Sequence, residues 1–140
     1  MSPTGVPAQD VIDEIIVEGN SELLVTTANE VGSGLARSER LTTGQIRNFF
    51  GAVRQIEAKV RPTDAELSDA VYRQFLMLKP KLAYQAERER QARKGDGVAI
   101  LEKVLRPAID AVGRDARRFH NFMDFFEAIL AYHKAAGGRD

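Results

Sequence analysis

The 140-residue chain is long enough to bury one hydrophobic core, and its 44% apolar and 29% charged residues are typical of a globular domain. It contains no cysteine, which excludes disulfides, thiolate catalysis and cysteine-bound zinc or iron–sulfur centres. No apolar run reaches about 18 residues, and the N-terminal sequence lacks the basic start and apolar centre of a signal peptide. We therefore expect a cytoplasmic protein that spans no membrane.

Charge is balanced overall but unevenly distributed along the chain. Lys and Arg together number 20, as do Asp and Glu, yet the first 36 residues hold six acids and no basic residue. Residues 37–118 hold 18 basic and 11 acidic residues. This segregation predicts one surface for a polyanion and another for a basic neighbour, and we expect Asp13 and Glu14 to face that neighbour.

Apolar residues three and four positions apart predict helices from the start of the chain, and no strand pattern competes with them. The first helix is expected over residues 7–18. A second begins at Ser21 and continues to about Leu35. Gly32 and Gly34 either weaken its last turn or let another helix approach closely.

Two capping boxes predict the next helix starts. Thr42 followed by Gln45 opens a third helix, which Pro62 ends. Thr63 followed by Glu66 predicts the start of a fourth. That helix should bend or restart near Lys79, because Pro80 disfavours helical geometry at the residue before it.

The remaining segments extend the helical pattern to the C-terminus. Residues 81–94 permit a helix but become polar, so we expect an exposed linker over residues 89–97. A helix over residues 98–112 should kink at Pro107, and the last runs over about residues 115–136. The prediction is an all-α fold, a compact bundle of five to seven helices forming one domain over residues 1–140, with 1–6 and 137–140 frayed.

A search for catalytic and metal sites finds no candidate. His120 and His133 lie 13 residues apart on one predicted helix, too far to share a metal, and His133 suits a packing or capping role. Asp124 and Glu127 lie one helix turn apart, but no second cluster accompanies them. We expect no enzyme activity, no metal and no cofactor.

Residues 78–94 form the most basic segment of the chain. They contain six Lys or Arg and only two Glu, with Tyr84 among them. A basic segment with an aromatic ring can hold a nucleic-acid backbone and stack on a base. A solvated linker helix is the alternative interpretation.

Arginine recurs every seven residues at positions 40, 47, 54 and 61. Seven residues return to nearly the same helix face, drifting by about 20°, so Arg47 and Arg54 lie on one stripe. That stripe could follow a phosphate backbone or be a solvated face. A further basic group near residue 118 opposes the helix dipole, which adds Arg118 to the candidates.

Phe125 and Tyr132 are seven residues apart and lie off the main apolar stripe of the last helix. Ordinary core packing would explain them. Exposed together beside Glu127, they would instead form an apolar patch for a protein partner or for self-association.

Three sequence blocks together resemble a known family. They are LTTGQIRNFFGAV (41–53), LMLKPKLAYQAER (76–88) and NFMDFFEAILAYHK (121–134), about 40 of the 140 positions. In this order, within a helical chain of this size, they resemble the small subunit of the type III-A CRISPR interference complex, the Csm complex.

The resemblance implies a non-catalytic helical bundle that acts in antiviral defence. Several copies would stack along a filament of backbone subunits, beside the large subunit, and hold guide RNA and target RNA through basic residues. When the family's contacts are transferred to the matching positions of this sequence, the expected RNA contacts are Arg47, Lys79, Lys81 and Arg88. Tyr84 would stack on a base or support the turn. Arg54 and Arg118 come from the charge pattern alone. The expected subunit contacts are Phe125, Glu127, Tyr132, Asp13 and Glu14.

Two other functions remain open from the sequence. A structural adaptor could use the same bundle without touching RNA. A DNA-binding helix-turn-helix regulator would use Arg47, Asn48, Arg54 and Gln55, although the connection over residues 35–43 is looser than that motif requires.

Overall fold

Helices make up the regular structure of the part of the chain that the computed structural model describes, residues 6–38 and 41–138. No strand forms in these residues, and the all-α bundle that the sequence predicts is confirmed. The seven helices are α1 (Gln9–Ile16), α2 (Ser21–Ser38), α3 (Thr43–Glu57), α4 (Asp69–Leu76), α5 (Leu78–Gln91), α6 (Gly97–Val112) and α7 (Ala116–Ala135).

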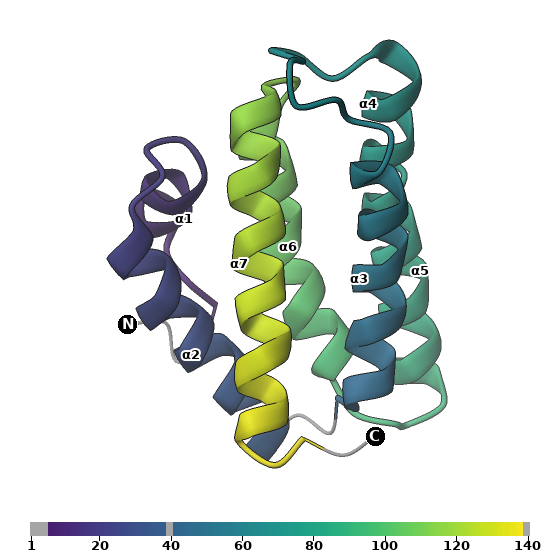
Figure 1. Cartoon of the computed structure of the whole chain (residues 1–140). Helices are drawn as coiled ribbons and strands as arrows, with labels where there is room; N and C mark the ends of the chain where they lie inside the picture. Colours follow the sequence, from purple (N-terminus) through teal and green to yellow (C-terminus); the bar gives the residue numbers. More distant parts are fainter. Residues whose placement is uncertain (1–5, 39–40, 139–140) are drawn as a thin grey trace.

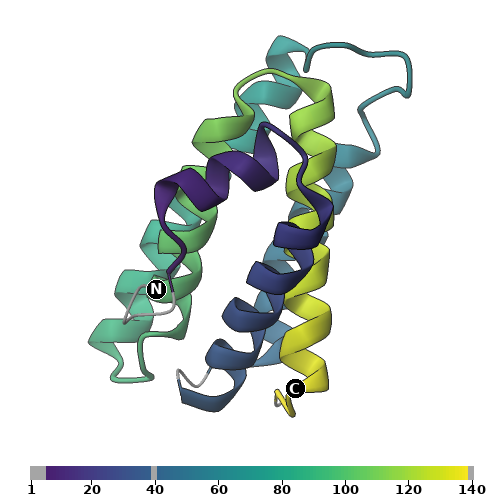
Figure 2. The same ribbon diagram turned by 90° about the vertical axis from the view of Figure 1, so that its left-hand side faces the viewer.

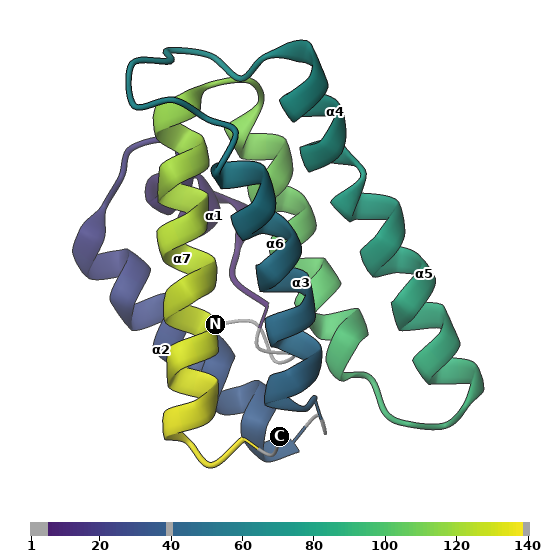
Figure 3. The ribbon, with the colours of Figure 1, turned by 45° about the vertical axis from the view of Figure 1, so that its right-hand side comes forward.

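Helix α7 is the centre of the bundle. Helix α2 packs along one side of it, α3 along another, and α6 behind it (Figure 1). Helix α1 contacts α6, α7 and α2, as the turned view shows (Figure 2). Helix α5 lies at the opposite edge of the molecule from α2 and packs mainly on α6 (Figure 3).

The core is rich in phenylalanine. Phe75 of α4 meets Phe119 and Phe122 of α7 edge to face, with ring centroids 5.1 Å apart in both pairs. Phe50 of α3 meets Phe126 in the same way at 5.3 Å. Such edge-to-face pairs add to the stabilisation from apolar burial and connect α3 and α4 to the central helix.

The idea that Phe125 and Tyr132 form an exposed patch is wrong for Phe125, whose side chain is 0% exposed. Tyr132 is half-buried and packs against the core. The reason is that α2 covers this side of α7. Core packing, the alternative weighed for these residues, describes the structure.

Gly32 explains how α2 approaches α7 so closely. A Cβ atom at this position would lie 2.5 Å from the Ile129 carbonyl oxygen and 2.9 Å from the His133 nitrogen. Both are backbone atoms, so no rotamer change could make room for a methyl group. Of the two interpretations that the sequence allows for Gly32, the close approach of a second helix is the one observed.

His133 joins the C-terminal end of α7 to the start of α3. Its Nε2 donates a hydrogen bond to the Leu41 carbonyl at 2.6 Å. A carbonyl oxygen can only accept, so in the neutral ring Nδ1 accepts from the Thr43 hydroxyl, 3.1 Å away. His133 and Thr43 are both fully buried. The packing or capping role expected for His133 is therefore confirmed as a buried hydrogen-bonded contact.

The predicted capping boxes have different outcomes. At α3 the box is present, because the Thr42 side chain accepts from the Gln45 N–H and the Gln45 side chain accepts from the Thr42 N–H. The box expected at Thr63 and Glu66 is wrong, and Ser68 caps α4 instead.

Backbone pairing explains why the helix does not start at Thr63. The Leu67 N–H donates to the Arg114 carbonyl at 2.8 Å, and the Ala116 N–H donates to the Ala65 carbonyl at 3.0 Å. This bridge holds residues 65–67 extended against the turn between α6 and α7. A side-chain cap cannot form a helix from backbone that is already paired elsewhere.

The outcome at Pro80 is close to expectation. The chain restarts as α5 at Leu78, so Lys79 is helical and the break comes slightly earlier than predicted. Pro80 lies in the first turn, where its missing N–H costs no hydrogen bond. Pro107 lies inside α6, which runs unbroken as one element through Val112.

The segments expected to fray or to be linkers are more ordered than predicted. Helix α5 continues to Gln91 and α6 begins at Gly97, which is buried, so the connection is shorter than residues 89–97. Val6 packs against the core, and the Gly138 N–H donates to the His133 carbonyl at 2.9 Å. Residues 1–5 and 139–140 of the expected frayed ends, and Arg40 of the arginine series, lie outside the described residues.

We predict that Gly32→Ala lowers the free energy of unfolding by about 1–3 kcal/mol, because its Cβ would overlap the α7 backbone. Gly34→Ala in the same helix is the matched control, since no atom lies within 4 Å of its Cβ position. There alanine should raise stability by about 0.5–1 kcal/mol. Urea denaturation measures both, and equal effects at the two positions would contradict the close approach.

We predict that stability falls with acidification through His133. Burial lowers the pKa of its imidazole below the ordinary value of 6.5, although the hydrogen bond to Leu41 opposes this effect. As pH falls, the unfolded state therefore binds the proton first. The free energy of unfolding keeps its full value above pH 6.5 and decreases as pH falls below 6.5. In urea denaturation at several pH values, His133→Gln should weaken this dependence. His120→Gln, with an exposed ring, is the control, and equal pH dependence in both variants and wild type would refute the prediction.

Candidate nucleic-acid interface

The outer face of α5 presents an aromatic ring between two cations. Lys81, Tyr84 and Arg88 are three, four and seven residues apart, which places them on one side of the helix. All three are exposed, Tyr84 by 64%, and the Arg88 guanidinium lies 5.9 Å from the Tyr84 ring centroid. We call these three residues the α5 face. The helical rise separates Lys81 from Arg88 by about 10 Å along the axis.

The charge of the α5 face is not neutralised locally. Lys81 and Arg88 form no ion pair within the described part of the chain. By contrast, Arg90 is paired with Glu87, and this hydrogen bond holds the pKa of the Glu87 carboxyl below its usual range. Within α5, the unpaired Lys81 and Arg88 therefore differ from the paired Arg90 beside them.

Lys79 does not belong to the α5 face. Its Nζ lies 2.6 Å from Asp110 Oδ1 on α6, and its side chain is 33% exposed. Two residues along a helix correspond to a rotation of about 200°, so Lys79 points almost opposite to Lys81. The structure thus gives Lys79 a contact between helices, whereas the sequence predicted an RNA contact.

Arg47 and Arg54 are exposed on α3 but lie apart from the α5 face. The side of α3 toward α4 and α5 carries Ala52 and Ile56, and by helical rotation the two arginines point away from it. Arg54 also stacks on the Phe50 ring, 5.8 Å from its centroid, and lies 3.9 Å from a Glu57 oxygen. The two arginines form a separate basic stripe.

Arg118 is also separate. It is half-buried in the first turn of α7, and its guanidinium donates to the Ala111 carbonyl of α6 at 3.4 Å. This contact holds the end of α6 against α7. The seven candidate RNA contacts are therefore divided among four places, and the largest group is Lys81, Tyr84 and Arg88 on the α5 face.

A groove of about 290 Å³ lies beside the α5 face, between α3 and the junction of α4 with α5. Lys59, in the turn after α3, and Lys81 of α5 both line it, and the Lys59 Nζ donates to the Gln74 side chain of α4 at 3.1 Å. Sequence reasoning missed Lys59, Gln55, Gln74 and Met77 as lining residues. No spacing rule brings together α3 and α5, which are more than 20 residues apart in the sequence.

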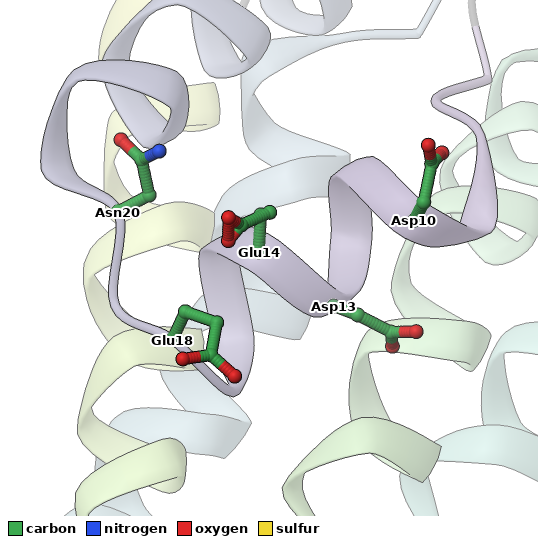
Figure 4. A pocket seen from close by; sticks show the side chains of 5 residues that line it. All are labelled: Asp10, Asp13, Glu14, Glu18 and Asn20. Atoms are coloured by element: carbon green, nitrogen blue, oxygen red, sulfur yellow. The ribbon is translucent and has the colours of Figure 1, made fainter.

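The acidic residues of the N-terminal region form a separate surface. Asp10, Asp13, Glu14, Glu18 and Asn20 line an open hollow of about 600 Å³ on and after α1, and no basic residue lines it (Figure 4). Helix α1 is on the opposite side of the bundle from α5 (Figure 1). The charge segregation seen in the sequence is thus also a separation in space.

The other expected interface residues differ in exposure. Asp13, Glu14 and Glu127 are exposed, Tyr132 is half-buried, and Phe125 is buried. Only the first three are fully available to a partner in this structure.

Among the described residues, no group of His, Asp and Glu is arranged to hold a metal ion, and no helix is long and apolar enough to cross a membrane.

Comparison with known proteins identifies the chain. The sequence model of the family described as Csm2 Type III-A matches residues 18–139. No curated protein matches the sequence. The match covers α2 to α7 and includes all three blocks that suggested the resemblance. The chain therefore belongs to the Csm2 family, the small subunit of the type III-A CRISPR Csm complex.

Proposed function

We propose that this small subunit is a non-catalytic, cytoplasmic RNA-holding protein that binds guide and target RNA through the α5 face. The observation that carries the proposal is the exposed Tyr84 ring between the unpaired cations Lys81 and Arg88. Phosphates attract such cations, and bases stack on such a ring. Neither contact reads base identity, so the guide supplies sequence by pairing and the protein follows the backbone.

Repeated copies of the small α5 face would together be sufficient for RNA binding. Two cations and one ring offer few contacts, and their effect weakens with salt. Several copies stacked along the filament would each add such a face, and effective concentration would raise the affinity of the whole assembly. Arg47 and Arg54, on a separate stripe, would contact a second RNA strand.

The acidic surface of α1 would then meet a basic neighbour in the complex. Asp13 and Glu14 are exposed on this surface, and its position opposite α5 supports stacking in which the acidic side of one copy meets the basic side of another component. Glu127 and the exposed edge of Tyr132 would add to subunit contacts. Family membership speaks against the helix-turn-helix alternative.

We predict that Lys81→Ala/Arg88→Ala weakens binding to a 40-nucleotide single-stranded RNA without changing the fold. Loss of two phosphate contacts should lower the slope of log affinity against log salt by about 1.4, at ~0.7 per contact. Lys79→Ala should leave the slope unchanged, because Asp110 already pairs with that charge. Fluorescence anisotropy across a salt series measures these slopes.

The matched control is Lys103→Ala/Arg117→Ala, which removes two exposed cations outside the α5 face. Equal weakening in both double variants would show a general charge effect and contradict the α5 face. Tyr84→Ala should reduce affinity at every salt concentration with the slope preserved, since the ring carries no charge. Unchanged RNA affinity in every variant would favour the adaptor function.

We predict that Asp13→Lys/Glu14→Lys impairs assembly into the Csm complex, because it reverses the charge that meets the basic neighbour. Glu30→Lys/Asp124→Lys makes the same charge change at exposed positions outside the α1 surface. Mass spectrometry of the purified complex gives subunit stoichiometry. Normal stoichiometry for the first variant would refute the proposed contact.

A further inference from the structure

The groove beside the α5 face combines an apolar floor with cationic edges. Ile56 of α3 with Met77 and Leu78 at the start of α5 provide apolar surface, and the Met77 side chain remains 48% exposed. Lys59 and Lys81 stand on its two sides. An exposed methionine is adaptable in shape and packs well against flat rings.

The charges of the groove favour an anionic ligand. Both charged residues that line it are lysines, and no carboxylate lines it. Lys81 forms no ion pair within the described part of the chain, and Lys59 bonds only to the neutral Gln74 amide. The groove therefore offers two ammonium groups to an anion and has no acidic side chain to repel one.

Polar groups at the groove suit the edge of a base. Gln55 is exposed and its side-chain amide forms no hydrogen bond among the described residues, so this amide can both donate and accept. Base edges present the same mixture of donors and acceptors. The volume of about 290 Å³ is near the lower limit of small-molecule pockets, which suits one ring system.

The position of the groove connects it to the proposed RNA path. Lys81 belongs both to the α5 face and to the groove lining. A backbone that follows Lys81 and Arg88 would therefore carry its bases past the groove opening. A paired base is stacked within its duplex, so a base that enters the groove must come from an unpaired nucleotide.

We propose that the groove between α3 and the α4–α5 junction binds one unstacked nucleotide of the RNA. Its ring lies against Met77 and Ile56, and its flanking phosphates lie near Lys59 and Lys81. The inference rests on the proposed RNA function, and it adds a pocket for a base to a surface that otherwise follows only the backbone.

The test uses a short single-stranded oligouridine RNA that carries one 2-aminopurine, whose fluorescence reports unstacking. Ala52→Phe fills the groove from α3, and Ala58→Phe is the matched control because Ala58 is exposed and does not line the groove. We expect Ala52→Phe to weaken RNA binding by about fivefold or more and to abolish the fluorescence change. Ala58→Phe should behave as wild type.

Met77→Ala is a second variant that keeps the test valid if Ala52→Phe unfolds, because Met77 is half exposed and its removal leaves the core intact. It should reduce the fluorescence change while circular dichroism stays native.

Wild-type fluorescence and affinity in the groove variants, alongside lost binding in Lys81→Ala/Arg88→Ala, would overturn the proposal that the groove binds a nucleotide and leave the proposed function standing. Loss of complex assembly with RNA binding intact would assign the groove to a protein partner instead. No RNA binding by any form of the protein would overturn both.

Discussion

The close contact between α2 and α7 at Gly32 is the constraint on which the rest of the bundle depends. Without a side chain at Gly32, the α2 backbone reaches the Ile129 carbonyl, and α2 closes over the side of α7 that carries Phe125. Helix α7 is thereby enclosed by α2, α3 and α6. Buried His133 fixes the register at one end by holding both the Leu41 carbonyl and the Thr43 hydroxyl. The core is complete around α7, and α5 remains at the periphery.

That peripheral position allows α5 to be basic. Only Leu78 and Leu82 of this helix are buried, so most of its circumference faces water. A helix held by so narrow an apolar stripe can carry Lys81, Tyr84 and Arg88 at little cost to the core. At an exposed site the contact of Arg88 with the Tyr84 ring contributes only about 0.5–1 kcal/mol to stability, whereas the arrangement suits a ligand with phosphates and flat bases. The residues that hold the core together and the proposed RNA surface therefore lie in different parts of the molecule.

The sequence predicts the helices better than it predicts the site. Local rules identify helices because apolar spacing and caps such as Thr42 with Gln45 act within a few residues. The cap at Thr63 fails because distant backbone at Arg114 pairs with that segment. The same limit applies to the site. Lys79 and Lys81 look equivalent in the sequence, and only the folded structure shows that Asp110 pairs with Lys79. Likewise, Lys59 becomes part of a groove only through tertiary packing.

In our proposal RNA lies along α5 and not along α1 or the separate arginine stripe of α3. The most direct measurement is a map of backbone amide chemical shifts by NMR during titration with a short single-stranded RNA. We expect the largest changes between Lys81 and Arg88, with smaller ones near Lys59 and none near Asp13. Changes concentrated around Arg47 and Arg54, with α5 unaffected, would contradict it.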